Sequence, residues 1–404
     1  MVELGGSAPR IVRLITDRLA GTTAAERRCL ELLALAEPVG FADLVGIFGS
    51  EVVASLEDAA FIRIHQDYRR LNVTLVHPVY GEVLRTQTGV TRRRELLLEF
   101  IACVEAHGRR RSGDQLRIAA WEASAGVATP DTLIRAAGLA RRTHQHGQAV
   151  SFLRSLPRTR QTAPILHMLG DSHFQLGDWR EAESILRRVA GANYTATADD
   201  VGLRSTLIRM VNLYWSGVAL SEVLKIGRQM NAREHDPHAH RSFRAVAASL
   251  AMVSGHPETG LAQLTSITDS APDIRSVMTE SNRAIGLVVI GRSQDGLDAA
   301  EVCDKMLAET SGDPATQTAA LEPLRLFALT ELGQLSNVER RVEDLIERKS
   351  RPWPLLTDTW LALQRGRCAW VAGRAEDARL HLIDAVTVSR SAGHSRVFRL
   401  AYSL

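Results

Sequence analysis

Apolar positions recur along most of this chain with the spacing of amphipathic helices, and the helices come in pairs. The clearest pair spans residues 163–189, where an apolar helix with Gly170 at its centre is followed by a turn that contains Gly177. In the second helix of this pair, Ala182 and Leu186 lie on the apolar face. The pattern repeats around glycines that are 36 to 42 residues apart, at Gly177, Gly217, Gly255, Gly291, Gly333 and Gly373.

A repeat of this length is typical of an α-solenoid, in which each helical hairpin buries its apolar face only against its neighbours. The tetratricopeptide pattern is matched best in the first and last copies, which carry Leu166, Gly170, Trp179, Ala182 and Leu186, and Gly366, Ala378 and Leu382. Other copies depart from it, because Ala248 and Ala284 take the place of the central glycine and Glu222 is a mismatch in the second helix. The spacing also exceeds the standard length of about 34 residues, so we predict divergent tetratricopeptide-like hairpins.

The first 90 residues follow a different pattern. A capping box formed by Thr23 and Glu26 begins a helix that ends near Ala36, and two shorter helices follow over residues 41–48 and 51–60. The alternating runs FIRIHQ and LNVTLVH then predict a two-stranded hairpin. Three helices and a hairpin predict a winged-helix domain, so the predicted fold is mostly all-α. The predicted domains are the winged helix over 1–90, connecting helices over 91–130 and the repeat superhelix over 131–404.

An apolar stripe near the N-terminus is formed by Ile11, Leu14, Ile15 and Leu19, which recur with helical spacing. The stripe either folds back on the helix from Cys29 to Leu35 or stays exposed and drives self-association. The sequence alone leaves both outcomes open.

Composition and charge limit the kinds of binding partner and the cellular compartment that we expect for this protein. A formal net charge of +3 is too small to mark a nucleic-acid or membrane surface. The four cysteines are scattered without a Cys-x-x-Cys pair, so we expect buried free thiols and no metal site, and we interpret the run His235–His240 as a solvated loop. The N-terminus does not resemble a signal peptide, and no apolar run approaches the ~20 residues of a membrane span. We therefore expect a cytoplasmic protein.

In their order along the chain, these parts resemble the C-terminal two-thirds of large ATP-binding LuxR-type regulators of actinobacteria, which belong to the signal-transduction ATPases with numerous domains (STAND). The matching stretches are DRLAGTTAAERRCLELLALAEPVGFADLVGIFG, LVHPVYGEVLRTQTGVTRRRELL, LRIAAWEASAG and the hairpins, and LVHP is the most specific. The resemblance implies a repeat superhelix that receives a small-molecule inducer or a regulatory protein. The family's ATPase core and its DNA-binding helix-turn-helix have no counterpart in this sequence, so ATP or ADP would act only through a core supplied elsewhere.

The resemblance also implies roles for individual residues. His77, which precedes Pro78 at a helix start, matches the histidine that senses nucleotide in STAND proteins, and the alternative is that it only caps the helix. By similarity to tetratricopeptide units, six side chains of the first helices are expected to face the ligand or partner, namely His167, Asp171, Phe174, Leu207, Tyr214 and Trp370.

The sequence disfavours two other functional classes. A DNA-binding winged-helix transcription factor needs basic or amide side chains on its recognition helix, but residues 51–60 carry Glu51, Glu57 and Asp58 and no Lys, Arg, Asn or Gln. An enzyme needs a catalytic motif, and the sequence contains neither a phosphate-binding G-x-x-x-x-G-K-[ST] loop nor a nucleophile elbow. We therefore expect no enzymatic activity. A stand-alone tetratricopeptide adaptor remains the third reading.

Overall fold

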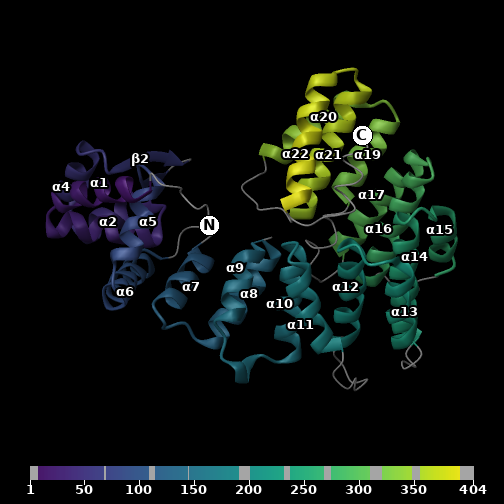
Figure 1. Ribbon diagram of the computed structural model, residues 1–404, viewed down its shortest axis with the longest axis horizontal. Coiled ribbons are helices and arrows are strands. Elements are labelled where there is room, and N and C mark those ends of the chain that lie inside the picture. The colour runs from purple at the N-terminus through teal and green to yellow at the C-terminus, as the bar shows by residue number, and fades with distance from the viewer. Residues whose placement is uncertain are drawn as a thin grey trace. The chain divides into compact units, whose positions relative to one another are not determined.

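The computed structural model describes residues 8–67, 70–108, 114–143, 145–190, 201–231, 237–267, 274–309, 321–347 and 355–391. The chain divides into two compact units, Met1–Ala136 and Ala137–Leu404, which we call the N-terminal unit and the repeat unit. Figure 1 shows the two units and labels most of their helices and strand β2. Among the described residues, none of the helices combines the length and the apolar character needed to cross a lipid bilayer.

The N-terminal unit combines helices with one small antiparallel sheet. Its elements are α1 (Ala8–Ala20), α2 (Ala24–Ala36), β1 (Val39–Gly40), α3 (Phe41–Phe48), α4 (Ser50–Asp58), β2 (Ile62–Asp67), β3 (Arg70–Leu75), α5 (Pro78–Gln87), α6 (Val90–Ala106) and α7 (Asp114–Ser124), and α8 (Pro130–Arg142) crosses into the repeat unit. The helices and the hairpin predicted for residues 23–77 are confirmed. The sequence did not predict β1, which pairs with β3 through Val39 and Val73, because two residues are too few for an alternating pattern to show.

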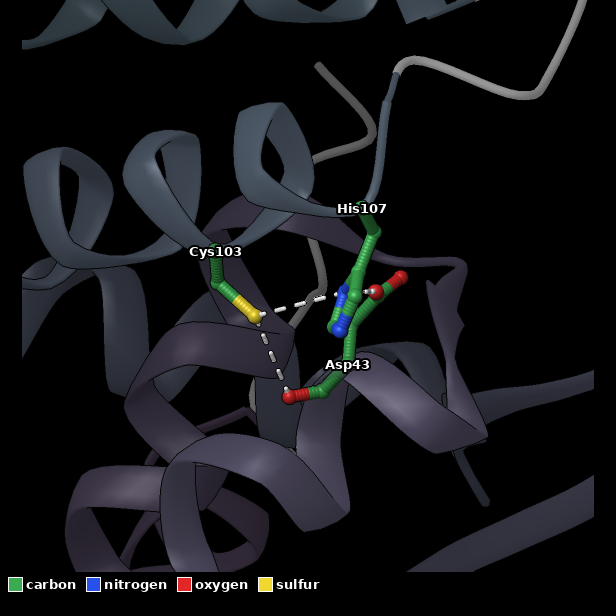
Figure 2. A group of neighbouring side chains, drawn as sticks. All are labelled: Asp43, Cys103 and His107. Atoms are coloured by element: carbon green, nitrogen blue, oxygen red, sulfur yellow. Dashed lines mark hydrogen bonds and ion pairs between the residues drawn. The ribbon is translucent and has the colours of Figure 1, made fainter.

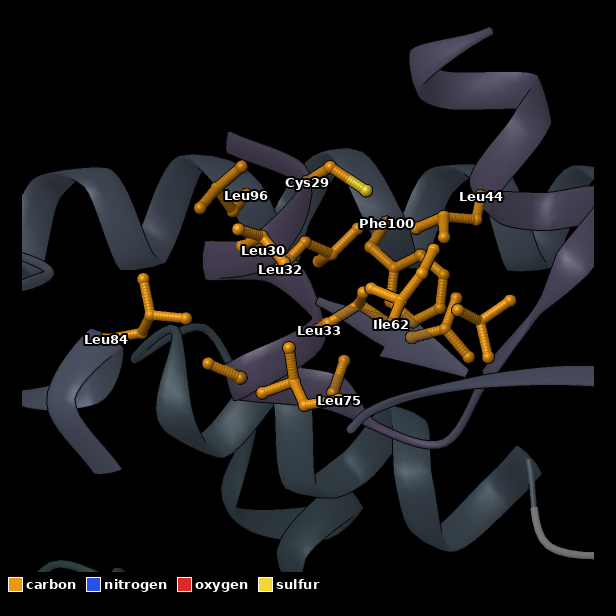
Figure 3. Close-up of a cluster of buried hydrophobic side chains, with 14 of the residues drawn as sticks. Cys29, Leu30, Leu32, Leu33, Leu44, Ile62, Leu75, Leu84, Leu96 and Phe100 are labelled. Atoms are coloured by element: carbon orange, nitrogen blue, oxygen red, sulfur yellow. The ribbon is translucent and has the colours of Figure 1, made fainter. Parts of the chain in front are cut away.

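Helix α2 is the centre of the N-terminal core. Its predicted capping box is present, since the Thr23 side chain accepts a hydrogen bond from the Glu26 backbone and the Glu26 side chain accepts one from the Thr23 backbone. Leu30, Leu32 and Leu33 are all fully buried, although they point in different directions around the helix. Figure 3 shows them among side chains from the sheet and from helices α3, α5 and α6. Because its buried leucines point in several directions, α2 must be covered by several elements.

The predicted N-terminal stripe is only partly covered. Leu19 is buried in the N-terminal core and Ile15 packs against it, whereas Leu14 is 63% exposed. Helix α1 makes its principal contact with α5, and Arg18 donates a hydrogen bond to the Tyr80 hydroxyl at 2.6 Å. The side chain of Ile11 lies outside the described residues. Half of the stripe therefore belongs to the core, and Leu14 remains on the surface.

The repeat unit is an α-solenoid of helical hairpins. Before the first hairpin lie α9 (His146–Arg154) and a short 3-10 helix, η1 (Arg158–Arg160). The hairpins are α10 (Ala163–Gln175) with α11 (Trp179–Ala190), α12 (Val201–Trp215) with α13 (Leu220–Asn231), α14 (Pro237–Val253) with α15 (Pro257–Thr265), α16 (Ile274–Val289) with α17 (Ser293–Glu309), α19 (Leu321–Glu331) with α20 (Leu335–Glu347), and α21 (Leu355–Val371) with α22 (Ala375–Ser391).

All six predicted turn glycines adopt the same conformation. Each has a positive φ, between 70° at Gly333 and 104° at Gly217, which glycine adopts without a steric penalty. After each glycine, the next amide donates a hydrogen bond to the carbonyl five residues earlier, as from Asp178 to His173 and from Arg374 to Ala369. This is the Schellman arrangement that ends a helix and satisfies its last carbonyl groups. The repeated glycine thus marks the end of the first helix in every hairpin.

A second set of glycines lets the paired helices approach closely. A Cβ added to Gly170 would lie 2.7 Å from Leu186, and one added to Gly366 would lie 2.7 Å from Leu382, the partners expected from the tetratricopeptide pattern. In two central hairpins the glycine stands on the second helix instead, at Gly260 and Gly296, opposite the alanines that replaced it on the first. The close crossing is therefore kept, with the small residue supplied by the other helix.

The mismatch at Glu222 has a structural cause. Helix α13 begins three residues after its turn glycine, whereas α11 begins two residues after its own. This longer turn shifts the register by one residue, so Val223 is fully buried and Glu222 is exposed. The apolar face of α13 is intact, because Val223 takes the buried position that Ala182 has in α11.

Candidate functional site

Successive first helices contact one another throughout the repeat unit, from α10 to α12, α14, α16, α19 and α21. The second helices make their main contacts with the first helices before and after them. This arrangement places the first helices side by side as one continuous wall, which we call the inner wall. In solenoids of this type such a wall is the surface on which ligands bind.

A buried polar cluster ties the beginning of this wall together. Asp171 of α10 forms an ion pair with Arg141 of α8, and the Nδ1 atom of His167 lies 2.9 Å from the Ser205 hydroxyl of α12. His167, Asp171 and Ser205 are all buried. Polar side chains from three helices thus pair with one another inside the unit, where an unpaired polar group is costly.

Burial and charge set the protonation of this cluster. Burial lowers the pKa of His167 to about 4, so the imidazole is neutral near pH 7. Burial also opposes ionisation of Asp171, but the positive charge of Arg141 outweighs it and holds the pKa of this carboxyl below its usual value. The cluster therefore contains a charged pair beside a neutral histidine.

The pH dependence of stability should report on His167. Its pKa is about 4 in the folded chain and 6.5 for a solvated imidazole, so the unfolded chain binds more protons between these limits. Its contribution is complete above pH 6.5 and is lost as the pH falls towards 4, by about 2 kcal/mol between pH 7 and pH 5. Urea unfolding at pH 7 and pH 5 measures the loss of unfolding free energy on acidification. This loss should be smaller in His167→Gln than in the wild type, by about 2 kcal/mol. An equal loss in both proteins would contradict the assignment.

The other residues predicted to face a ligand differ in how far they are exposed to solvent. Phe174 is half-buried and packs against Trp179, with ring centroids 5.7 Å apart and ring planes tilted by 58°. Leu207 and Tyr214 are buried in a hydrophobic cluster, and the Tyr214 hydroxyl donates a hydrogen bond to the Val253 carbonyl at 2.9 Å. Trp370, by contrast, is 57% exposed. In this structure Leu207 and Tyr214 join neighbouring hairpins, whereas Phe174 and Trp370 keep accessible surface. Their role in ligand binding stays a prediction.

An aromatic contact on the inner wall was missed from the sequence. Trp215, near the end of α12, lies edge-to-face against Trp360 of α21, with ring centroids 6.3 Å apart. Both rings are partly exposed, and Trp215 also packs against the cluster around Leu363. The contact joins the second and sixth hairpins, which are almost 150 residues apart in the sequence. The only sequence signal was the position of Trp215 near a turn glycine on a first helix.

His77 caps a helix, as both interpretations of its position require, and nucleotide sensing stays a prediction. It is the N-cap of α5, and its Nδ1 atom accepts a hydrogen bond from the Val79 amide at 3.2 Å. The side chain is exposed. Because Nδ1 is an acceptor, the neutral ring carries its proton on Nε2, which can still donate to an anion.

One further group of reactive side chains lies in the N-terminal unit. Figure 2 shows Asp43 of α3 beside Cys103 and His107, which lie one turn apart at the end of α6. The His107 Nδ1 atom is 2.8 Å from an Asp43 carboxylate oxygen and 3.9 Å from the Cys103 sulfur. The sulfur is also 3.8 Å from the Asp43 carbonyl oxygen. The sequence did not indicate this group, since α3 and α6 are about 60 residues apart.

The geometry does not fit a Cys-His-Asp nucleophile. In such a triad the histidine uses one ring nitrogen for the nucleophile and the other for the carboxylate, but here both partners approach Nδ1. Burial and the negative charges of Asp43 and Glu99 also raise the pKa of the Cys103 thiol. The other three cysteines are buried free thiols, as predicted. Residues 232–236, which include part of the His235–His240 run, lie outside the described residues.

No family model matches the sequence, and none of the curated proteins matches it. Among solved structures, the chain is similar to the Rap conjugation gene regulator of plasmid pLS20 in complex with the Phr* peptide, at 13% identity over 78% of this chain and 89% of that chain, with a TM-score of 0.49. It is also similar to a STAND protein with a tetratricopeptide repeat sensor from Pyrococcus horikoshii, at 12% identity over 96% and 67% of the two chains, with a TM-score of 0.34. At these identities and TM-scores the likenesses carry no argument about function.

Proposed function

We propose that the repeat unit binds a peptide, a regulatory protein or a small inducer on its inner wall, as the sensory part of a LuxR-type STAND transcription regulator. The observation that carries this proposal is the unbroken contact of first helices from α10 to α21. A wall built in this way offers many neighbouring side chains to one extended ligand.

Two aromatic features on the wall suit ligand binding. Phe174 and the Trp215–Trp360 pair belong to first helices and keep part of their surface accessible. Aromatic side chains contribute a large apolar area at a low cost in conformational entropy, and they often dominate binding energy. The buried His167–Asp171 cluster then acts as the rigid support of the wall rather than as a ligand contact.

The topology of the N-terminal unit supports the proposal that this chain is part of a transcription regulator. Helix α2, strand β1, helices α3 and α4, and strands β2 and β3 follow in the order of a winged helix, with sheet order β1-β3-β2. The exposed side chains of α4 include Glu51, Glu57 and Asp58, which would repel phosphate groups. We propose that this domain packs against protein, and that His77 contacts nucleotide only when an ATPase core is supplied.

The inner wall can be tested with peptides selected from a displayed random library against the full chain. Binding of the selected peptides to Phe174→Ala and Trp360→Ala should weaken at least about tenfold, because each variant removes an aromatic contact. Isothermal titration measures the affinity, and circular dichroism confirms that the variants are folded.

A matched control comes from the second helix of the last hairpin. Leu380 of α22 is apolar and half-exposed, so Leu380→Ala removes a similar side chain away from the first helices. This variant should bind the peptides as the wild type does. Loss of affinity in Leu380→Ala with full affinity in Phe174→Ala and Trp360→Ala would place the site elsewhere.

The regulator assignment has its own test. The DNA on both sides of the segment that encodes this sequence should encode an ATPase core upstream and a helix-turn-helix downstream. If neither is encoded, the chain is a stand-alone adaptor and the LuxR-type assignment is wrong, whatever the outcome of the peptide experiment.

A further inference from the structure

We propose that Asp43, Cys103 and His107 form a binding site for a divalent transition metal ion of the zinc type. The three side chains supply one sulfur, one nitrogen and one oxygen atom, all within 4.8 Å of one another. Thiolate, imidazole and carboxylate are the ligands that proteins use for Zn²⁺. Calcium and magnesium are excluded, because they require oxygen ligands.

The distances between the ligand atoms suit such an ion. Bonds of about 2.3 Å to sulfur and about 2.0–2.2 Å to nitrogen and oxygen place the ligand atoms of a tetrahedral site about 3.3–3.6 Å apart. Here the nitrogen–oxygen distance is 2.8 Å and the nitrogen–sulfur distance is 3.9 Å, so one is shorter and one longer than this range. Small side-chain rotations would bring both into it. The side chain of His107 is 53% exposed, so solvent rather than tight packing surrounds about half of it.

The fold holds the three ligands on rigid elements. Cys103 and His107 are four residues apart on α6, so their side chains lie on the same face of the helix. Helix α3 packs against α6 and carries Asp43 at its first turn. Figure 2 shows the carboxylate and the thiol on either side of the imidazole ring.

The electrostatics also favour a cation at this place. His107 is the C-cap of α6, and the carbonyl groups at a helix C-terminus attract positive charge. A thiolate and a carboxylate together balance the two positive charges of the ion. Three protein ligands leave one coordination position for water, and the exposed His107 side chain places the site next to solvent.

The nearest alternative is that His107 and Asp43 form only a surface ion pair, with Cys103 beside it by chance. If that alternative is correct, an added metal ion does not bind the Cys103 sulfur. Thiolate ligation gives cobalt a charge-transfer absorption band in the near ultraviolet, which distinguishes the two readings.

The experiment is a titration of the full, reduced chain with Co²⁺, followed by displacement with Zn²⁺. We expect one equivalent of cobalt to produce the thiolate band and the visible bands of tetrahedral coordination, and zinc to abolish both. Cys103→Ser should lose the charge-transfer band, and its affinity for zinc should fall at least about 100-fold. Asp43→Asn and His107→Gln should weaken binding while the sulfur band persists at high cobalt concentration.

Two matched controls remove the same residue types elsewhere. Cys368→Ala removes a buried thiol of the repeat unit, and His65→Gln removes an exposed imidazole of β2. Both should bind cobalt as the wild type does. A cobalt spectrum without the sulfur band, or a band that Cys103→Ser retains, would overturn the proposal. This outcome is independent of the peptide experiment, which concerns the other unit.

Discussion

Substituting Asp171 with alanine is expected to lower the free energy of unfolding of the repeat unit by about 3–5 kcal/mol. The substitution leaves the Arg141 guanidinium without its carboxylate in a position where its side chain is only 16% exposed. Removing one member of a buried ion pair costs more than the pair contributes, because the remaining charge stays desolvated. Urea denaturation followed by circular dichroism measures the change.

Two control variants separate this effect from a general loss of charge. Glu376 and Arg379 form an ion pair in which both side chains are more than half exposed, so Glu376→Ala should leave the unfolding midpoint unchanged. Replacing both members of the buried pair, in Arg141→Met with Asp171→Leu, should recover most of the lost stability. If the double variant is as unstable as Asp171→Ala, the loss comes from packing and not from the stranded charge.

Gly260→Ala is expected to destabilise the repeat unit by about 3 kcal/mol, although the change adds only one methyl group. The new Cβ would lie 2.2 Å from Met252 Cγ and 2.5 Å from the Ala248 carbonyl oxygen. The Met252 side chain is fully buried, and the backbone of α14 cannot move without separating the two helices. Overpacking of this kind forces a backbone shift.

Gly147→Ala is the matched control for this prediction. Gly147 also lies in a helix, α9, but nothing stands within 4 Å of its added Cβ. The variant should be as stable as the wild type or more stable by up to about 1 kcal/mol, because alanine favours helix. Thermal unfolding of both variants measures the difference. Equal midpoints for Gly260→Ala and the wild type would show that α14 and α15 are not in close contact.

The local features of this fold were determined by the sequence itself. The six turn glycines could be recognised because only glycine adopts the positive φ of a Schellman turn without cost, so the repeat needs it at every hairpin. The capping box of Thr23 and Glu26 was equally clear, since its two hydrogen bonds link residues three positions apart. Such signals depend on neighbours along the chain, and their spacing can be read directly.

Contacts between distant segments were decided only by the tertiary structure. His167 and Asp171 were expected to face a ligand. In the structure, Ser205 of α12 contacts the His167 ring and Arg141 of α8 forms an ion pair with Asp171. Whether an inward polar side chain meets a ligand or another helix depends on what packs opposite, and helical spacing does not contain that information.

The same limit applies to the two groups that sequence reasoning missed. Trp215 meets Trp360 only because the intervening hairpins curve, and Asp43 meets His107 only because α3 packs on α6. The Trp215–Trp360 contact depends on the summed rotations of several helix crossings, whereas the Asp43–His107 contact depends on the single crossing of α3 and α6. Periodicity along the chain determines which face of a helix is apolar, whereas the crossing geometry determines which distant side chains that face meets.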